Sequence, residues 1–123
     1  MNWLSVFIGG GLGSLVRWGV FRLMNRTYPA ISPIISTFIV NAIGCLMIGF
    51  LFAMAMSKSS AENFKLFWLV GFLGGLTTFS TLGLDIFQLI QQKTFLYASL
   101  YFLFHGFVCI SFVYLGNWMY SLR

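Results

Sequence analysis

The sequence predicts an all-α, polytopic membrane protein that forms one domain of four transmembrane helices over residues 1–123. Two observations come from composition, because 59% of the residues are hydrophobic and only 7% are charged. A soluble domain of this size could not keep so much apolar surface from water. The third observation is that four apolar runs each reach the roughly 20 residues that cross a bilayer. The polar connections between them are short and leave no room for a separate soluble domain.

The first apolar run covers about residues 2–24 and the second about 34–56. The first run lacks a basic start and a small-residue cleavage site, and Arg17 interrupts it, so we interpret it as a mature membrane helix and not a removed signal. The second run begins after Pro33, and proline is favoured at the start of a helix.

The third run covers about residues 66–90, and its centre, 71–83, is a poor helix sequence of paired glycines followed by hydroxyl-bearing residues. At membrane depth, backbone leaves the helix only where protein or a wet cavity satisfies its polar groups. We therefore expect a broken third helix. The alternative is close helix packing through small residues, which accounts for the glycines, Gly75 among them, better than for the hydroxyls. The fourth run covers about residues 95–119.

The net charge of +5 comes from basic residues scattered singly at the ends of the runs, which is typical of headgroup anchors and not of nucleic-acid binding. Four spans place both termini and the 57–65 loop on one side of the membrane. Cytoplasmic loops normally carry an excess of Lys and Arg, and neither side has one. The hypothesis is dual insertion, with two opposed copies as the working unit; the alternative is a weak bias overridden by the first helix. The basic residues are Lys58, Lys65 and Arg123 on one side and Arg22, Arg26 and Lys93 on the other.

Two polar side chains stand out within the first two spans. A charge inside a membrane is costly and functional by default, so Arg17 is expected to donate to freed carbonyls or to fix a dimer seam, in preference to contacting a substrate. Asn41 lies in the middle of the second span. Its amide needs partners in hydrocarbon, and two interpretations stay open: donation to an anion, or a hydrogen bond between helices.

Hydroxyls and aromatic rings form the next group of candidates. Ser80 and Thr81 follow the expected break and either bond back to their own helix or form a row of donors along a conduction path. Phe38 and Phe79 either pack in the core or present a partially positive ring edge to a poorly hydrated anion.

The remaining polar residues lie further along the chain. Tyr101 and His105 are four residues apart and share a helix face, which suggests a pore hydroxyl and a satisfied interior histidine. Asp85 is expected towards the membrane end of the third span. Cys45 and Cys109 lack metal-ligand spacing and are interpreted as small packing residues. The sequence contains no nucleophile–base pair, phosphate loop or metal cluster, so we expect no enzyme.

Three motifs together resemble the Fluc (CrcB) family of fluoride channels, over essentially the whole chain. The first is Gly9-Gly10 with Gly13 and Arg17, and the second is Thr37-Phe38-x-Val40-Asn41-x-x-Gly44. The third is Gly74-Gly75-Leu76-Thr77-Thr78-Phe79-Ser80-Thr81.

The resemblance implies a passive fluoride channel of the bacterial cytoplasmic membrane that relieves fluoride toxicity. It further implies an antiparallel, dual-topology homodimer with two pores and a structural sodium ion (Na+) at its centre. The sodium would be held by backbone carbonyls of Gly74 and Thr77 from both subunits. By motif position, the pore phenylalanine, the pore asparagine, the hydroxyl track and the first-helix arginine fall on Phe79, Asn41, Ser80, Thr81 and Arg17, with Tyr101 added to the track.

The chain departs from the family pattern at Leu82, where family members carry a second pore phenylalanine. This leaves open a pore-impaired subunit that pairs with a paralogue, as well as a working homodimer. A small four-span drug or guanidinium exporter is the chief rival. Such exporters need a membrane-embedded carboxylate, whereas the first span offers only Arg17, and that charge favours an anion.

Overall fold

The computed structural model describes residues 2–57 and 61–123, and within them the chain is all helix and short connections. The four predicted spans are present as four long apolar helices, each of which extends a few residues beyond its apolar run. The third is assembled from several pieces. In order, the helices are α1 (Asn2–Thr27), α2 (Ser32–Ser57), α3 (Glu62–Lys65), the π-helical η1 (Leu66–Phe72), α4 (Leu73–Leu76), α5 (Phe79–Gln92) and α6 (Phe95–Ser121).

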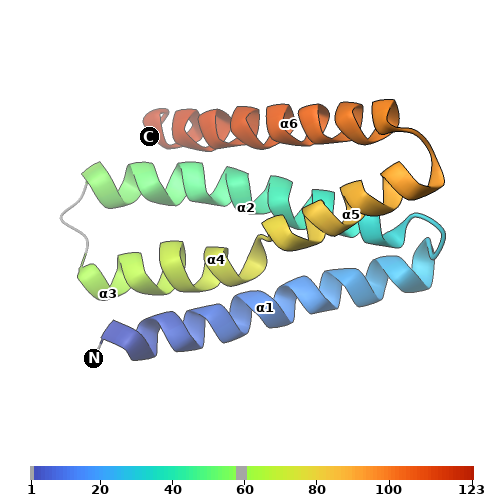
Figure 1. Cartoon of the computed structure of the whole chain (residues 1–123). Coiled ribbons are helices and arrows are strands. Elements are labelled where there is room, and N and C mark those ends of the chain that lie inside the picture. The colour runs from blue at the N-terminus through green and yellow to red at the C-terminus, as the bar shows by residue number, and fades with distance from the viewer. Residues whose placement is uncertain (1, 58–60) are drawn as a thin grey trace.

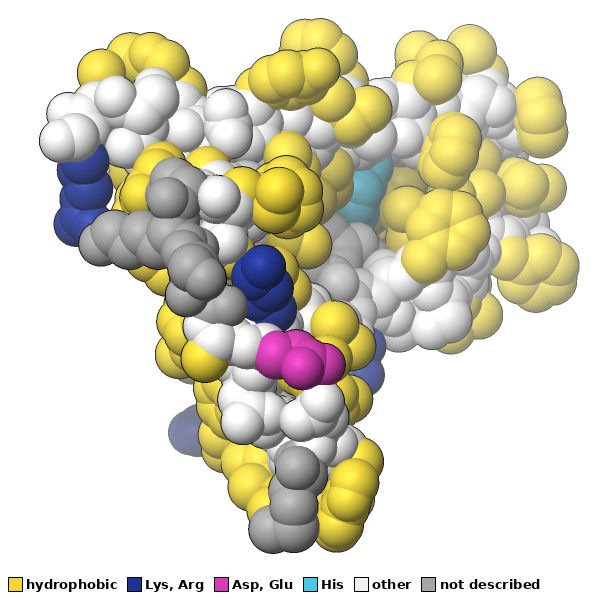
Figure 2. Space-filling model, turned by 90° about the vertical axis from the view of Figure 1, so that its left-hand side faces the viewer, with side chains coloured by type: hydrophobic (Ala, Val, Ile, Leu, Met, Phe, Trp, Pro, Cys, Tyr) yellow, Lys and Arg dark blue, Asp and Glu magenta, His cyan; other side chains and the backbone are white. Residues whose placement is uncertain are grey.

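The spans lie side by side and alternate in direction, so the start of α1, the end of α2, the start of α3 and the end of α6 lie at one end of the bundle (Figure 1). This is the arrangement assumed in the charge tally above, although Lys58 lies outside the described residues. Large hydrophobic side chains are exposed along the spans, for example Phe7, Phe52 and Phe107, and a view from that end shows hydrophobic side chains around the outside of the bundle together with a few charged ones (Figure 2). An apolar exterior is what a bundle facing lipid requires.

Helix α1 packs against the first half of the third span through glycines. A Cβ added to Gly13 would collide with the backbone carbonyl of Phe72, and one added to Gly75 would collide with the backbone carbonyl of Gly10. The two backbones are therefore in direct contact, which is the close approach that small residues permit between membrane helices. Gly75 thus lies at a close contact between backbones, which corresponds to the packing alternative given for the glycines.

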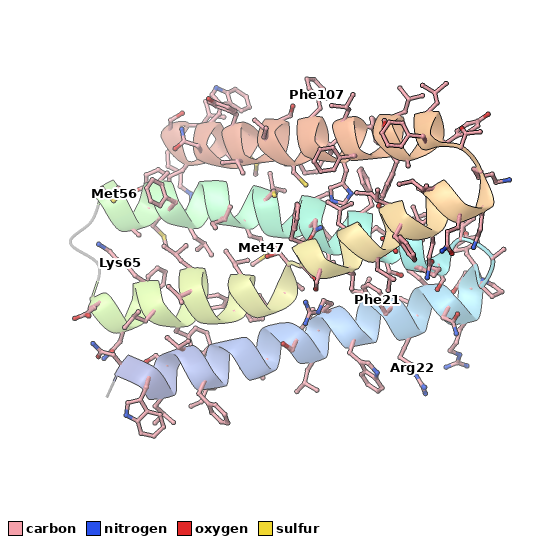
Figure 3. All side chains as sticks on the ribbon, viewed as in Figure 1. Phe21, Arg22, Met47, Met56, Lys65 and Phe107 are labelled. Carbon is pink, nitrogen blue, oxygen red and sulfur yellow. The ribbon has the colours of Figure 1, made fainter. Side chains whose placement is uncertain are left out.

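Helices α2 and α6 form the other tight pair. A Cβ on Gly49 would meet the carbonyl of Val113, and one on Gly116 would meet the carbonyl of Leu46. Between the two pairs lies a small core of Val40, Leu73 and Leu76 with larger side chains around it. Met47 points into this space, whereas Phe107, which is 72% exposed, points away from the bundle (Figure 3).

Two residues with extended backbone separate α4 from α5. Thr77 has ψ 157°, and Thr78 has φ −153° and ψ 127°. The interruption falls inside the 71–83 stretch, and α5 leaves the line of α4 at this point (Figure 1). The third span is therefore two helices joined end to end, and the polar groups at the joint need partners.

The glycine contacts between α1 and the third span predict a matched pair of variants. Gly13→Ala forces α1 away from the Phe72 carbonyl and should destabilise the fold by about 1–3 kcal/mol. Gly19→Ala, on the same helix, meets no atom within 4 Å and should be neutral or stabilise the helix by up to about 1 kcal/mol. The measurement is the free energy of unfolding in detergent, and equal effects at the two positions would refute the close contact.

Candidate functional site

The interruption at Thr77–Thr78 leaves backbone groups that a continuous helix would have paired. In such a helix, the N–H of Thr78 would donate to the carbonyl of Gly74. Instead it donates to Asn41 Oδ1 at 2.8 Å, and Asn41 Nδ2 donates back to the carbonyl of Thr78 at 3.0 Å. The Asn41 amide thus pairs with both polar groups of one extended residue. Both side chains are at least nine-tenths buried, so these hydrogen bonds substitute for water.

The C-terminal end of α4 carries free carbonyls and the negative end of the helix dipole. The Thr77 N–H and its Oγ1 both donate to the Leu73 carbonyl, at 2.9 and 2.8 Å. Arg17 Nη1 donates to the Thr77 carbonyl at 3.3 Å from α1. The partly buried guanidinium is therefore placed where the broken helix presents negative charge. This is the structural role that the sequence suggested for Arg17.

Thr78 also begins the next helix, because its hydroxyl caps α5 by accepting the N–H of Thr81 at 3.4 Å. Its Oγ1 lies 3.1 Å from Ser80 Oγ. Ser80 is exposed, and the buried Thr81 Oγ1 has no hydrogen-bond partner among the described residues. The two predicted hydroxyls thus lie together at the positive, N-terminal end of α5, and one of them is unsatisfied.

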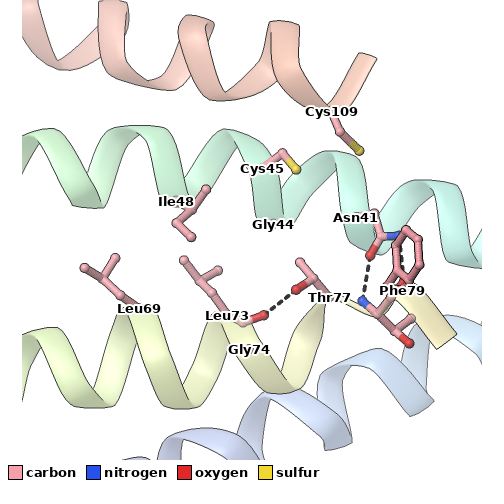
Figure 4. Close-up of a pocket in the computed structure, with 11 residues that line it drawn as sticks. Asn41, Gly44, Cys45, Ile48, Leu69, Leu73, Gly74, Thr77, Phe79 and Cys109 are labelled. Carbon is pink, nitrogen blue, oxygen red and sulfur yellow. Dashed lines mark hydrogen bonds between the residues drawn. The ribbon is translucent and has the colours of Figure 1, made fainter. Parts of the chain in front are cut away.

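Two cavities flank the interruption, and Thr78 lines both of them. The larger, of about 470 Å³, lies between α2, α4 and α6 and contains Asn41, Gly74, Thr77 and Phe79 in its wall (Figure 4). The smaller, of about 340 Å³, lies between α1 and α5 and is lined by Arg17, Ser80 and Thr81 among others. The structure therefore gathers seven of the predicted site residues around one point of the chain.

Three predicted site residues, Gly75, Phe38 and Tyr101, lie outside both cavities, and Gly75 is at the contact with α1 described above. The Phe38 ring stacks on Phe104 with centroids 5.6 Å apart and meets His105 edge-on at 5.5 Å. The Tyr101 hydroxyl donates to the carbonyl of Ile34 at 3.2 Å. The Phe38 and Tyr101 side chains both pack between α2 and α6, which corresponds to the packing alternative for Phe38.

Asp85 lies on α5 and is buried inside the bundle, which the sequence analysis did not predict. Its side chain is 3% exposed, and Oδ2 has no hydrogen-bond partner among the described residues. The packing of α5 against α2 and α6 buries it. The chain therefore does contain a buried carboxylate in a span. The sequence argument against a drug or guanidinium exporter, which relied on the lack of such a carboxylate, holds only for the first span.

Thr78 is the central residue that the sequence analysis did not single out. It was one of several hydroxyls in the glycine-rich stretch, and only the extended backbone makes it the partner of Asn41 and the cap of α5. A Thr three residues before Thr81, at the point where the helix sequence fails, is a helix-cap signal that could have identified it.

These features define a class: a small multi-span membrane protein with an interrupted span and polar groups inside it, as in membrane transport proteins. The chain belongs to the CrcB-like family, because the family model described as "CrcB-like protein, Camphor Resistance (CrcB)" matches residues 4–117.

Relatives named "Fluoride-specific ion channel FluC" resemble the chain over most of its length. The protein from Azobacteroides pseudotrichonymphae genomovar. CFP2 is 39% identical over 112 residues, which cover 90% of this chain and 89% of that protein. The protein from Helicobacter pylori (strain Shi470) is 37% identical over 104 residues, 82% and 80% of the two chains. That from Coxiella burnetii (strain CbuK_Q154) is 36% identical over 122 residues, 94% of each.

Proposed function

We propose that the protein is a fluoride-specific ion channel that exports fluoride passively across the bacterial cell membrane and so relieves fluoride toxicity. A channel is a transporter and not an enzyme. The observation that carries the proposal is family membership over nearly the whole chain, combined with polar groups gathered at an interruption in the third span. Selective conduction needs such groups, because an ion that loses its water must find replacements along the path.

The site offers groups suited to a small, strongly hydrated anion. Ser80 and Thr81 stand at the N-terminal end of α5, where the helix dipole favours negative charge. Phe79 is 75% exposed in the single subunit, so its ring is available to line a narrow passage with a positive edge. In this mechanism the hydroxyls replace water one at a time, and the rings limit the width of the pore. Asn41 contributes to the proposed pore by bonding the backbone of Thr78, which keeps the third span interrupted at this point.

The working unit we propose is an antiparallel dimer, with a second copy of this chain or a paralogue as the partner. The balanced charge of the two ends supports insertion in both directions. The exposure of Phe79 and Gly74 beside the larger cavity supports a partner at this surface, since a complete pore needs a second wall. Leu82, which replaces a phenylalanine in the family pattern, is only 5% exposed and packs inside the subunit.

A sodium ion at the dimer centre fits the carbonyls that the interruption frees. The Gly74 carbonyl loses its helical donor, because the Thr78 N–H bonds Asn41 instead. The Thr77 carbonyl loses the Thr81 N–H to Thr78 Oγ1 and keeps one lone pair beyond its bond to Arg17. Carbonyl oxygens are suitable ligands for a hard cation. Bound there, sodium would hold the two subunits' interruptions together.

A small drug or guanidinium exporter is the second candidate, and the buried carboxylate of Asp85 is the observation in its favour. Such an exporter exchanges protons for organic cations. Asp85 lies on the third span and not on the first, and it lines neither of the two cavities. The family match and the names of the relatives favour the channel.

The channel predicts selective leakage from liposomes that contain the purified protein. Fluoride should escape and chloride should not. Thr81→Val removes a buried hydroxyl with no protein partner and should slow fluoride efflux roughly tenfold, because a hydrogen bond to a charged group is worth about 1.5–3 kcal/mol. Thr27→Val is the matched control, since that hydroxyl bonds its own helix at the exposed end of α1. Equal leakage of the two anions would reject the channel, and equal rates for the two variants would remove Thr81 from the path.

The sodium proposal predicts that fluoride efflux requires sodium and that this requirement does not depend on the side chain of Thr77. Protein purified in N-methylglucamine should lose most of its fluoride efflux and regain it when sodium is added. Thr77→Val keeps the backbone carbonyl and loses only the hydroxyl bond to Leu73, so its sodium requirement should match that of the wild type. Fluoride efflux that is independent of sodium would contradict the site.

A further inference from the structure

The packing of α2 against α6 contains one continuous chain of side-chain hydrogen bonds that leads to the interruption. Asn41 Nδ2 lies 3.1 Å from His105 Nε2, His105 Nδ1 lies 3.2 Å from the Tyr101 hydroxyl, and that hydroxyl donates to the Ile34 carbonyl at 3.2 Å. His105 is the middle of this chain and is 2% exposed. The sequence analysis treated it only as a satisfied interior histidine.

At the Asn41 end of this series of hydrogen bonds, the role of one ring nitrogen of His105 is fixed. Asn41 Oδ1 accepts the Thr78 N–H, so the amide orientation is set and Nδ2 faces both the Thr78 carbonyl and His105. An amide Nδ2 can only donate, and it has two hydrogens for these two neighbours. His105 Nε2 must therefore be the unprotonated, accepting nitrogen.

The Tyr101 end of the chain requires the same tautomer independently. The Ile34 carbonyl can only accept, so the single hydroxyl proton of Tyr101 is used there. The Tyr101 oxygen is then an acceptor towards the ring, and His105 Nδ1 must carry the hydrogen. Rings hold the imidazole on two sides, because Phe38 and Tyr101 both meet it edge-on with centroids 5.5 Å away.

We infer that His105, as the neutral Nδ1–H tautomer, is a positioning residue that holds the Asn41 amide on Thr78 and thereby fixes the interruption of the third span. Exchanging the oxygen and nitrogen of the Asn41 amide would already break both of its hydrogen bonds to Thr78. With His105 accepting on one side, that exchange would also bring an oxygen against a lone pair. The histidine therefore adds a third hydrogen bond that favours the same amide orientation and holds the amide against Thr78.

The tautomer can be measured directly, because the chain contains a single histidine. The experiment is 15N NMR of the imidazole in the full-length protein in lipid at about pH 7.5, where a buried neutral histidine is observable. The expected spectrum shows a protonated Nδ1 and an unprotonated, hydrogen-bonded Nε2. A protonated Nε2 would overturn the inference, whatever the protein transports.

A substitution at the other end of the bond tests the coupling. Asn41→Asp replaces the Nδ2 donor with an oxygen, which can only accept. The His105 nitrogen that faces it, Nε2, should therefore become protonated. Asn117→Asp is the matched control, because that amide is exposed on the same helix as His105 and should leave the spectrum unchanged. If the 15N signal of His105 Nε2 is the same in Asn41→Asp as in the wild type, the two side chains are not coupled.

A third test measures fluoride efflux from liposomes, and it rests on the proposed function. His105→Leu should slow fluoride efflux at least about fivefold, the factor equivalent to one hydrogen bond of about 1 kcal/mol. His105→Gln offers an acceptor to Asn41 and a donor to Tyr101, and it should recover most of that loss. Equal losses of fluoride efflux in His105→Leu and His105→Gln would mean that His105 acts through packing and not through its hydrogen bonds. If the wild type leaks no fluoride at all, the proposed channel fails while the measured tautomer still decides the role of His105.

Discussion

The structure depends on one exchange of hydrogen bonds: the side-chain amide of Asn41 takes the place of helix backbone at Thr78. Unpaired backbone groups in hydrocarbon each cost several kcal/mol, so a span can open only where something replaces its lost bonds. An amide is suited to this task because it donates and accepts on one edge. Once it is in place, the third span becomes two helices whose free ends face each other.

The free ends then organise the surroundings electrostatically. The C-terminal end of α4 is covered by Arg17 from α1, and the N-terminal end of α5 presents Ser80 and Thr81. Opposite ends of two short dipoles thus meet at the interruption, with a cation on the negative side and hydroxyls on the positive side. Glycines bring α1 close enough for the guanidinium to reach, so backbone packing and charge placement are parts of one arrangement.

The sequence predicted the fold well because membrane spans need long apolar runs, and these are visible in composition. It also located the interruption, since paired glycines and hydroxyls are poor helix formers. It could not predict the partners. Whether Asn41 bonds an anion or a helix depends on which residue of another span lies opposite, and only the extended backbone of Thr78 brings that residue there. For the same reason the burial of Asp85 was missed, because burial depends on the packing of α2 and α6 around α5.

The most direct test of this account is the amide hydrogen exchange of Thr78, measured in lipid for the wild type and for Asn41→Ala. The account predicts a strongly protected Thr78 N–H in the wild type that loses protection selectively in the variant, while the neighbouring helical amides of α5 keep theirs. A Thr78 amide that is equally protected in both proteins would mean that it bonds the Gly74 carbonyl in a continuous helix. That result would contradict the interruption on which the proposed site is built.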